Sequence, residues 1–294
     1  MSLIIKDLIA IATKRLEAGG CLNPKLDAEI LLLYYMGADR SFLFAHFADE
    51  IDDKRCEAYF ELIDERGTGK PVQYITGRQE FMGISFLVSD SVLIPRQDTE
   101  SLVEEAIKMA NENHKTLGNL NILDLCCGCG AICVSLGYYL TKARLVATDI
   151  SKKALSVARK NAADYRVSGK IKFIQGDLFA PLKTGAFGKG HFDMIISNPP
   201  YIRSAVLATL QREITEHEPM IALDGGADGL DFYRRIISKA PGYLKKHGLL
   251  LLEIGYDQAE DLTDLLVSDG RYGDPEIIKD LAGRDRIVKV KRKK

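Results

Sequence analysis

The amino-acid sequence predicts an α/β fold, in which helices cover both faces of a parallel sheet, preceded by a small helical domain. From residue 96 onward, short apolar runs typical of buried strands alternate with segments of helical periodicity, as in βαβ units. Residues 1–77 show helical spacing only. The chain has 294 residues, 46% of them hydrophobic and 28% charged. Its size and composition are therefore those of a soluble globular protein of one or two domains.

The N-terminal region, residues 1–79, is expected to be a bundle of four or five helices. The first helix should stop at Gly19-Gly20. Asn23-Pro24 supplies a cap followed by a proline at the first helical position, which opens a second helix running to Gly37. Further helices are expected around residues 42–44 and over residues 53–66.

Residues 80–95 are expected to form a β-hairpin that links this bundle to a second domain, residues 96–294. Phe86 and Val88 alternate with polar neighbours, residues 89–91 read as a turn, and residues 92–94 resume the strand. In the second domain, strands are expected at 121–125, 143–149, 171–177, 192–197 and 248–254. The basic segment 289–294 is interpreted as a frayed, solvated end.

Charge and cysteine content exclude several classes of protein. The net charge is −1, so no global basic footprint for nucleic acid exists. No apolar stretch approaches the roughly 20 residues that span a bilayer, and no signal-peptide pattern opens the chain. Four of the six cysteines crowd into residues 126–133, which favours reduced thiols and a cytoplasmic location over a disulfide framework. No dimer pattern is visible, so a monomer is expected.

The strand at 192–197 runs directly into Asn198, Pro199, Pro200 and Tyr201. A residue before proline stays extended, and the two prolines have no N–H groups, so their carbonyls face outward without neighbouring donors. The segment is thus a stiff platform with one amide side chain, bare carbonyl acceptors and an aromatic ring. It suits a planar group carrying an NH₂ and predicts chemistry on an amide or amino nitrogen.

A second motif follows the strand at 121–125, where Gly128 and Gly130 open a turn into a helix. Glycines allow a ligand close to the backbone, and Asp149 ends the next strand, where an acid can bind ribose hydroxyls. A dinucleotide site would want a third glycine where Cys133 stands, so a nucleoside without pyrophosphate is favoured. Asp177 ends the third strand, where it would reach an adenine amino group, with Leu178 against the ring. Together with the NPPY motif, these residues predict S-adenosylmethionine (AdoMet).

Seven segments carry a resemblance to the HemK/PrmC family, the peptide chain release factor N5-glutamine methyltransferases. They are DAEILL (27–32), PVQYITGRQEFMG (71–83), LIPRQDTE (93–100), the turn at 124–132, SNPPYI (197–202), EPMIALDGGADGL (218–230) and GRDRIV (283–288). NPPY alone is shared with other amino-group methyltransferases, whereas its combination with the other segments is far more specific. The resemblance covers essentially the whole chain.

This resemblance implies a class I AdoMet-dependent methyltransferase domain with a seven-stranded sheet, and an N-terminal bundle that docks class 1 release factors. AdoMet would be converted to S-adenosylhomocysteine, and no metal would take part. The family's AdoMet site maps onto Cys126, Cys127, Gly128, Cys129, Gly130, Asp149, Asp177, Leu178 and Asn198, and its substrate clamp onto Asn198, Pro199, Pro200 and Tyr201. Two departures stand out: cysteines 126, 127 and 129 replace the usual Gly and Thr/Ser of the turn, and Gln97 replaces a proline.

The acceptor implied by the resemblance is the glutamine amide of the release factor's Gly-Gly-Gln loop. The Asn198 side-chain oxygen and the Pro199 carbonyl would each accept one N–H of this two-donor group, and Tyr201 would stack on the amide plane. No dedicated general base is evident in the sequence. An adenine-N6 methyltransferase acting on DNA or RNA is the alternative, and a non-catalytic AdoMet-binding module is a third reading. The charge argues against the former and the intact NPPY against the latter.

Several other features are given ordinary roles. The crowded cysteines lack the second, distant pair of a structural zinc site. A lowered thiol pKa at the helix N-terminus would make them modifiable. The five histidines, at 46, 114, 191, 217 and 247, are interpreted as surface or packing residues. Arg96 and Glu100 are expected either to shape the site or to form salt bridges. Residues 224–228 are expected to be a mobile loop over the substrate or a plain surface turn.

Overall fold

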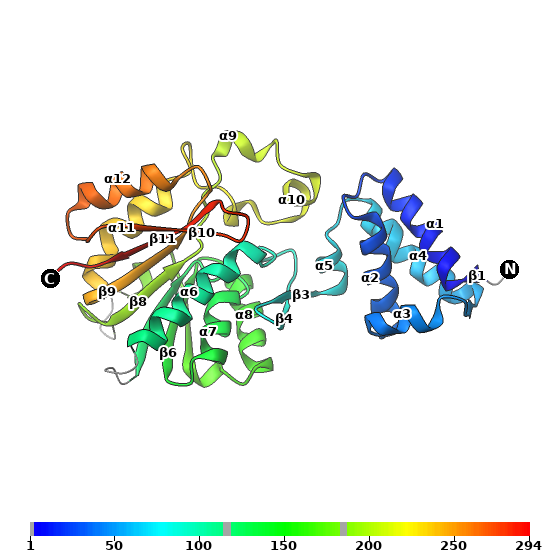
Figure 1. The fold of residues 1–294 in the computed structure, drawn as a ribbon, viewed down its shortest axis with the longest axis horizontal. Helices are drawn as coiled ribbons and strands as arrows, with labels where there is room; N and C mark the ends of the chain where they lie inside the picture. The colour runs from blue at the N-terminus through cyan, green and yellow to red at the C-terminus, as the bar shows by residue number, and fades with distance from the viewer. Residues whose placement is uncertain (1–2, 114–118, 183–186) are drawn as a thin grey trace. The chain divides into compact units, whose positions relative to one another are not determined.

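The computed structural model describes residues 3–113, 119–182 and 187–294. The chain divides into two compact units (Figure 1). The first comprises Met1–Arg78 and Leu210–Glu218, and the second comprises Gln79–Thr209 and Pro219–Lys294. The segment Leu210–Glu218 thus leaves the second unit after the NPPY motif and packs in the first. None of the helices in the described ranges is both long and apolar enough to cross a bilayer.

The first unit is a helical bundle. Its helices are α1 (Ile5–Ala18), α2 (Pro24–Met36), α3 (Arg40–His46), α4 (Asp53–Gly67), α5 (Val72–Thr76) and α10 (Arg212–His217). The expected boundaries of α2 are confirmed, since Pro24 opens it and Gly37 ends it in the left-handed conformation. The expectation of helices alone misses a short antiparallel pair, β1 (Leu3–Ile4) with β2 (Glu50–Ile51). Apolar side chains of α1, α2 and α4 form the core of the bundle.

The second unit is built on a seven-stranded sheet in the order β10-β11-β9-β8-β5-β6-β7. These strands are β5 (Leu120–Leu125), β6 (Ala143–Asp149), β7 (Ile171–Gln175), β8 (Phe192–Ser197), β9 (Leu244–Glu253), β10 (Glu276–Lys279) and β11 (Asp285–Lys291). The five strands from β7 to β9 are parallel, whereas β11 and β10 are antiparallel additions. The parallel sheet expected from the sequence is confirmed.

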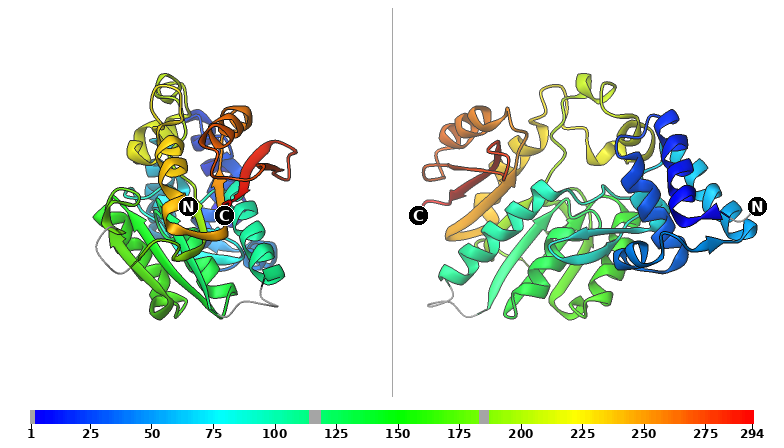
Figure 2. Two further views of the ribbon diagram at one scale, coloured as in Figure 1. Left: turned by 90° about the vertical axis from the view of Figure 1, so that its left-hand side faces the viewer. Right: turned by 45° about the vertical axis from the view of Figure 1, so that its right-hand side comes forward.

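Helices cover both faces of this sheet (Figures 1 and 2). One layer contains α6 (Gln97–Asn113), α7 (Ala131–Tyr139) and α8 (Lys152–Asp164), and the other contains α11 (Asp231–Tyr243) and α12 (Ala259–Asp269). The remaining helical turns are α9 (Ser204–Leu207), η1 (Ser168–Lys170), η2 (Ala180–Leu182) and η3 (Met220–Ala222). Because helices cover both faces, most side chains of the central strands are buried and most of these are apolar, as in other parallel sheets.

Two expectations about local structure are wrong. The hairpin exists as β3 (Arg78–Phe81) and β4 (Ile84–Leu87), but its turn is Met82-Gly83, where both residues have positive φ as a tight two-residue loop requires. Residues 92–94 form no strand. The basic segment is not frayed either, because Lys289 to Lys291 belong to β11. The Lys289 side chain is 12% exposed and pairs with Glu105 and Glu276.

The register of the sheet aligns the carboxyl ends of four strands. Leu125 lies opposite Thr148 on one side and Ser197 on the other, and Asp149 lies opposite Gln175. The residues that follow β5, β6, β7 and β8 therefore meet at one edge of the sheet. In open α/β sheets this edge is where ligands bind.

Candidate active site

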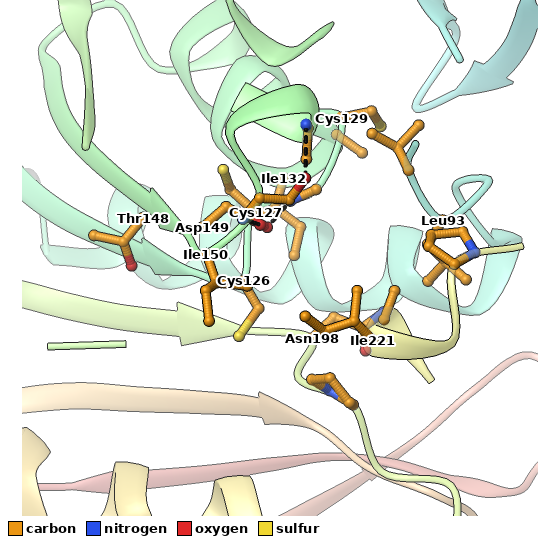
Figure 3. A pocket seen from close by; sticks show the side chains of 18 of the residues that line it. Leu93, Cys126, Cys127, Cys129, Ile132, Thr148, Asp149, Ile150, Asn198 and Ile221 are labelled. Carbon is orange, nitrogen blue, oxygen red and sulfur yellow. Dashed lines mark hydrogen bonds between the residues drawn. The ribbon is translucent and has the colours of Figure 1, made fainter. Parts of the chain in front are cut away.

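A cavity opens at this edge of the sheet, within the second unit (Figure 3). Most residues expected from the sequence line it: Cys126, Cys127, Gly128, Cys129, Asp149, Asp177, Leu178, Asn198 and Pro200. Gly130, Pro199 and Tyr201 do not line it. The cavity wall also includes residues that the sequence did not single out: Thr99 and Thr148, with Ile221, Phe232 and Arg235. The AdoMet motif and the Asn198 amide thus share one cavity.

The two glycines of the turn after β5 have different roles. Both have positive φ, 55° at Gly128 and 85° at Gly130, which an L side chain adopts only with strain. A Cβ on Gly128 would meet nothing within 4 Å, so this position faces open space at the cavity. A Cβ on Gly130 would lie 3.1 Å from Ala158 Cβ on α8. Gly128 therefore leaves room for a ligand, whereas Gly130 allows close packing of helices.

Asp149 is held by backbone N–H groups at the end of β6. Gly128 N donates to its Oδ2 at 2.9 Å and Ser151 N donates to its Oδ1 at 2.8 Å. Burial raises the pKa of this carboxyl, and the two N–H groups oppose the rise. Each carboxylate oxygen can accept a further hydrogen bond, so the pair fits two vicinal hydroxyls of a ribose. The neighbouring Thr148 Oγ1 is buried and has no partner in the described part of the chain. These groups fit a nucleoside.

Asp177 and Leu178 follow β7 and also line the cavity. The Asp177 carboxylate pairs with Arg235 of α11, and its side chain is 43% exposed. An adenine amino group would have to share this carboxylate with the guanidinium. Leu178 is 3% exposed and joins the hydrophobic core under the sheet edge. Arg235 is a residue that sequence reasoning missed, because it belongs to a helix without a recognisable motif.

The cysteines of the turn are buried thiols, and the expectation of a lowered pKa is wrong. Burial raises the pKa of Cys126, of Cys129 to about 12 and of Cys133 to about 11. A hydrogen bond with Cys133, followed by burial, raises the pKa of Cys127. The Asp124 and Asp149 carboxylates add to the rise in pKa at Cys126 and Cys127, and the pKa values of these two thiols are raised despite the nearby helix N-terminus. In the described ranges no group of three His, Cys, Asp or Glu side chains is placed to hold a metal.

Asn198 is oriented by a residue of the LIPRQDTE segment. Its Nδ2 donates to Thr99 Oγ1 at 3.1 Å. Thr99 lies in the first turn of α6 and is 4% exposed. No donor to Asn198 Oδ1 exists among the described residues, so the amide oxygen keeps its acceptor capacity at the cavity. The LIPRQDTE segment was recognised from the sequence as part of the family resemblance. The contact between its Thr99 and Asn198 is visible only in the structure.

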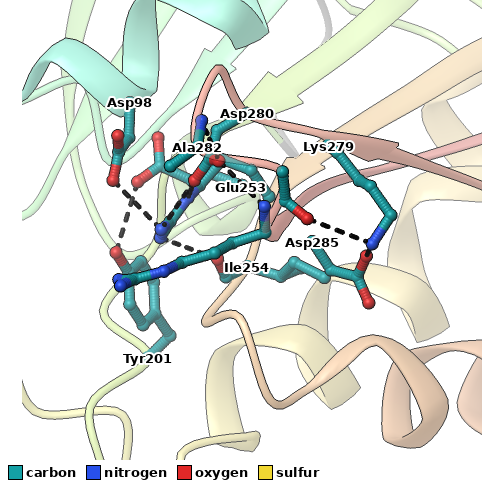
Figure 4. A network of polar contacts seen from close by, with 11 residues as sticks. Asp98, Tyr201, Glu253, Ile254, Lys279, Asp280, Ala282 and Asp285 are labelled. Carbon is teal, nitrogen blue, oxygen red and sulfur yellow. Dashed lines mark hydrogen bonds and ion pairs between the residues drawn. The ribbon is translucent and has the colours of Figure 1, made fainter.

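Tyr201 belongs to a buried polar cluster beside the cavity (Figure 4). Its hydroxyl donates to Glu253 Oε1 at 3.3 Å. Arg286 carries the positive charge of the cluster, since its guanidinium pairs with Asp98 at 3.0 Å and Asp280 at 3.2 Å. Burial raises the pKa of Glu253 to about 7, while the Thr99 hydroxyl, the Arg286 charge and the Tyr201 hydroxyl lower it. The hydroxyl of Tyr201 is thus anchored away from the cavity lining.

The glycine-rich segment 223–230 packs against the backbone of the NPPY motif. Ile202 N donates to Leu223 O at 3.0 Å and Gly225 N donates to Ile202 O at 2.8 Å. Gln258 Nε2 donates to Tyr201 O at 3.1 Å and to Gly229 O at 3.3 Å. The segment therefore braces the motif, a role that neither a mobile loop nor a plain surface turn describes.

The remaining candidates have structural partners or lie elsewhere. Glu100 Oε1 accepts a hydrogen bond from Met82 N at 2.5 Å, so Glu100 holds the hairpin turn. Arg96 lines the cavity. His114 lies outside the described residues, and the other four histidines do not line the cavity.

Known proteins resemble this chain over both units. Residues 7–77 match the family model described as PrmC N-terminal domain, and residues 108–227 match the methyltransferase small domain. The chain is 41% identical to a Moorella thermoacetica protein named release factor glutamine methyltransferase, over 96% of each chain. It is 37% identical to a Clostridium botulinum protein of the same name, over 99% of this chain and 100% of that one.

Solved structures share the fold at lower identity. The hMettl16 catalytic domain, in complex with MAT2A 3'UTR hairpin 1, aligns with a TM-score of 0.56 at 16% identity. The alignment covers 85% of this chain and 84% of that chain. This likeness shows a common methyltransferase fold.

Proposed function

Because this chain belongs to the release factor glutamine methyltransferase family, we propose that it methylates the glutamine of the Gly-Gly-Gln motif in class 1 peptide chain release factors. The methyl group would go from the sulfonium sulfur of AdoMet to the side-chain amide nitrogen, N5, leaving S-adenosylhomocysteine, and the nitrogen would then lose one proton. One observation supports this proposal at the level of the site: Asn198, whose Oδ1 accepts no hydrogen bond among the described residues, lines the same cavity as Asp149 and the Gly128 turn. A methyl donor and an NH₂ acceptor can therefore meet there.

The residues that would hold AdoMet are those whose chemistry fits its parts. Asp149 would bind the ribose hydroxyls, and the open space at Gly128 would let the ligand lie close to the backbone of the turn. Asp177 and Leu178 would contact the adenine, with Asp177 also retaining Arg235. The cysteines at 126, 127 and 129 contribute apolar wall and backbone rather than thiolates, because their pKa values are raised.

Bound AdoMet supplies an electrophilic methyl group on a sulfonium, so the chain's own task is alignment of the acceptor. Asn198 Oδ1 would accept one N–H of the glutamine amide, and the carbonyl of Pro199, a residue outside the cavity lining, would accept the other. These two hydrogen bonds orient the nitrogen and favour positive charge on it as the new bond forms. Alignment of this kind contributes several kcal/mol to catalysis. A glutamate side chain would place oxygen against these acceptors and be rejected.

The proposal also covers the partner and its location. The helical unit, residues 7–77 of which match the PrmC N-terminal domain, would dock the release factor. We expect the chain to act as a monomer in the cytoplasm, where release factors work, without a metal and without direct binding of nucleic acid.

A methyl-transfer assay with labelled AdoMet tests the proposal. We expect label in a release factor, none in a variant whose Gly-Gly-Gln glutamine is replaced by alanine, and none in DNA or RNA. Label in DNA or RNA adenine instead would support the adenine-N6 alternative. Binding of AdoMet without transfer to any acceptor would reduce the chain to a binding module.

A further inference from the structure

The side-chain amide of Asn198 ends in an oxygen and an NH₂ group that have nearly the same shape. The oxygen accepts hydrogen bonds, whereas the NH₂ group donates them. If Asn198 presents Oδ1 to the cavity, it accepts a hydrogen bond from an incoming NH₂ group. If the amide is flipped, it presents Nδ2–H, and two donors then face each other. Some neighbouring group must therefore decide between the two orientations.

We propose that Thr99 and Glu253 are positioning residues that fix the orientation of the Asn198 amide through a one-way chain of hydrogen bonds. This inference rests on the proposed function and extends it to residues that act on the acceptor through Asn198. Thr99 Oγ1 accepts from Asn198 Nδ2 at 3.1 Å. The Thr99 hydroxyl has one proton, and this hydroxyl is among the groups that lower the pKa of the Glu253 carboxyl, so we take Glu253 as the acceptor of that proton.

The direction of the chain follows from the chemistry of a carboxylate. An ionised carboxylate has no proton to donate, so both hydroxyls beside Glu253 must donate to it. Tyr201 does so at Oε1. Glu253 Oε2 is buried and accepts no hydrogen bond of ordinary length and angle within the described ranges, which leaves it available to the Thr99 proton. Thr99 then has only lone pairs for Asn198, and only Nδ2–H can meet them.

The surroundings of Glu253 make this direction dependent on ionisation. Glu253 is 1% exposed at the end of β9. The charged and titratable groups that face it are Asp98 on α6, Tyr201 after β8, Tyr233 on α11 and Arg286 on β11. When Glu253 is protonated, its own O–H can donate to Thr99. The Thr99 proton then turns toward Asn198, and the flipped amide becomes the better match.

Four variants test the chain of hydrogen bonds. Thr99→Val removes the hydroxyl at nearly constant shape, Thr99→Ser restores it, and Glu253→Gln replaces the obligate acceptor with a group that can donate. Thr263→Val is the matched control, since the one hydrogen bond of the Thr263 hydroxyl to a described residue lies within its own helix, to Ala259 O. The measurements are kcat and KM for methylation of release factor, the AdoMet Kd, and the melting temperature.

We expect Thr99→Val and Glu253→Gln to lower kcat by about 10- to 100-fold while the AdoMet Kd changes less than about threefold. Thr99→Ser and Thr263→Val should keep kcat within about threefold of wild type. The wild-type kcat should rise with pH through about 7, and this rise should be absent in Glu253→Gln. Wild-type kcat in Thr99→Val, or no rescue by Thr99→Ser, would overturn the inference.

A measurement independent of turnover separates this inference from the proposed function. In NMR spectra of ¹⁵N-labelled protein, the Asn198 side-chain amide should show one proton protected from exchange, assigned by its absence in Asn198→Ala. Protection should persist in Thr99→Ser and disappear in Thr99→Val. Equal exchange in wild type and Thr99→Val would refute the role of Thr99. An inactive wild type with the expected exchange pattern would refute the proposed function alone.

Discussion

Replacing Gly225 by alanine should move the backbone that presents Asn198 and Tyr201. A Cβ at position 225 would lie 2.7 Å from Tyr201 Cα and 2.8 Å from Tyr201 C. Both are backbone atoms, so no flexible side chain can turn aside. Gly225 does not have a positive φ, so its replacement adds no left-handed strain and the effect is one of space alone.

The size of the effect follows from that distance. Ordinary contact for a Cβ begins near 3.4 Å, so the new methyl group is about 0.7 Å too close. Overpacking of this kind costs about 1–3 kcal/mol of stability. If the NPPY backbone moves by most of that 0.7 Å, the acceptor is misplaced by a distance that can reduce turnover by roughly 10²-fold. We therefore expect a loss of activity larger than the loss of stability alone would cause.

Gly242→Ala is the matched control. Gly242 lies near the end of α11, is exposed, and a Cβ there would meet nothing within 4 Å. Alanine at an open helical position should stabilise by roughly 0.5–1 kcal/mol. The assay is denaturant unfolding together with kcat at a temperature where both variants are fully folded. If the Gly225→Ala variant has the same stability and turnover as the Gly242→Ala variant, residues 223–230 do not brace the NPPY motif.

Three further substitutions test other parts of the molecule. Asn198→Ala should lower turnover by about 10²-fold or more while AdoMet affinity, measured by calorimetry, falls much less; unchanged turnover would remove Asn198 from the site. Burial raises the pKa of Glu253 from 4.5 to about 7, so the folded state favours the protonated carboxyl. The resulting contribution to the free energy of unfolding, on the order of 3 kcal/mol, is fully present below pH 4.5 and is lost as the pH rises through 7. Glu253→Gln should abolish that decline in unfolding experiments between pH 4 and 8, and a decline like that of wild type would contradict the assignment. Arg66→Ala removes the buried guanidinium that pairs with Asp27 and Glu213 in the helical unit, and it should lower the free energy of unfolding by about 3–5 kcal/mol. Arg55→Ala, which removes an exposed pair with Asp52, should lower it by less than about 1 kcal/mol. Equal losses in the two variants would show that the buried cluster is unimportant for stability.

The central strands were predictable because burial on both faces makes each of them a mostly apolar run that ends at a turn signal. The segments 121–125, 143–149 and 192–197 meet this description, and the strands begin and end within one residue of the expected positions. The strands β10 and β11 went unpredicted because charged residues interrupt them. In β11, Lys289 is hidden by two carboxylates from α6 and β10, and no local pattern announces such partners.

Some residues of the candidate site were also predictable from the sequence, and others were not. Residues that follow each other along the chain, such as Asn198 with its prolines, carry their chemistry in a local motif and were predicted to act together. Thr99 and Glu253 were not, because they reach Asn198 and Tyr201 only through the order of strands and the position of α6. The cysteine pKa values could not be predicted either, because they depend on burial of the thiols in the fold, which the local motif does not reveal. Contacts between residues on different strands cannot be predicted from their spacing along the chain.

The position of β11 has a consequence for how the chain reaches its native state. This strand pairs with the outer edge of β9, yet it is made more than thirty residues later. Until residues 285–291 are synthesised, the run Leu249–Leu252 has one unpaired edge, a template to which strands of other chains can add. The interval between the two strands is thus a window of aggregation risk during synthesis. A nascent chain stalled within it should need chaperone protection that one stalled after β11 does not, which ribosome-bound intermediates of defined length would reveal.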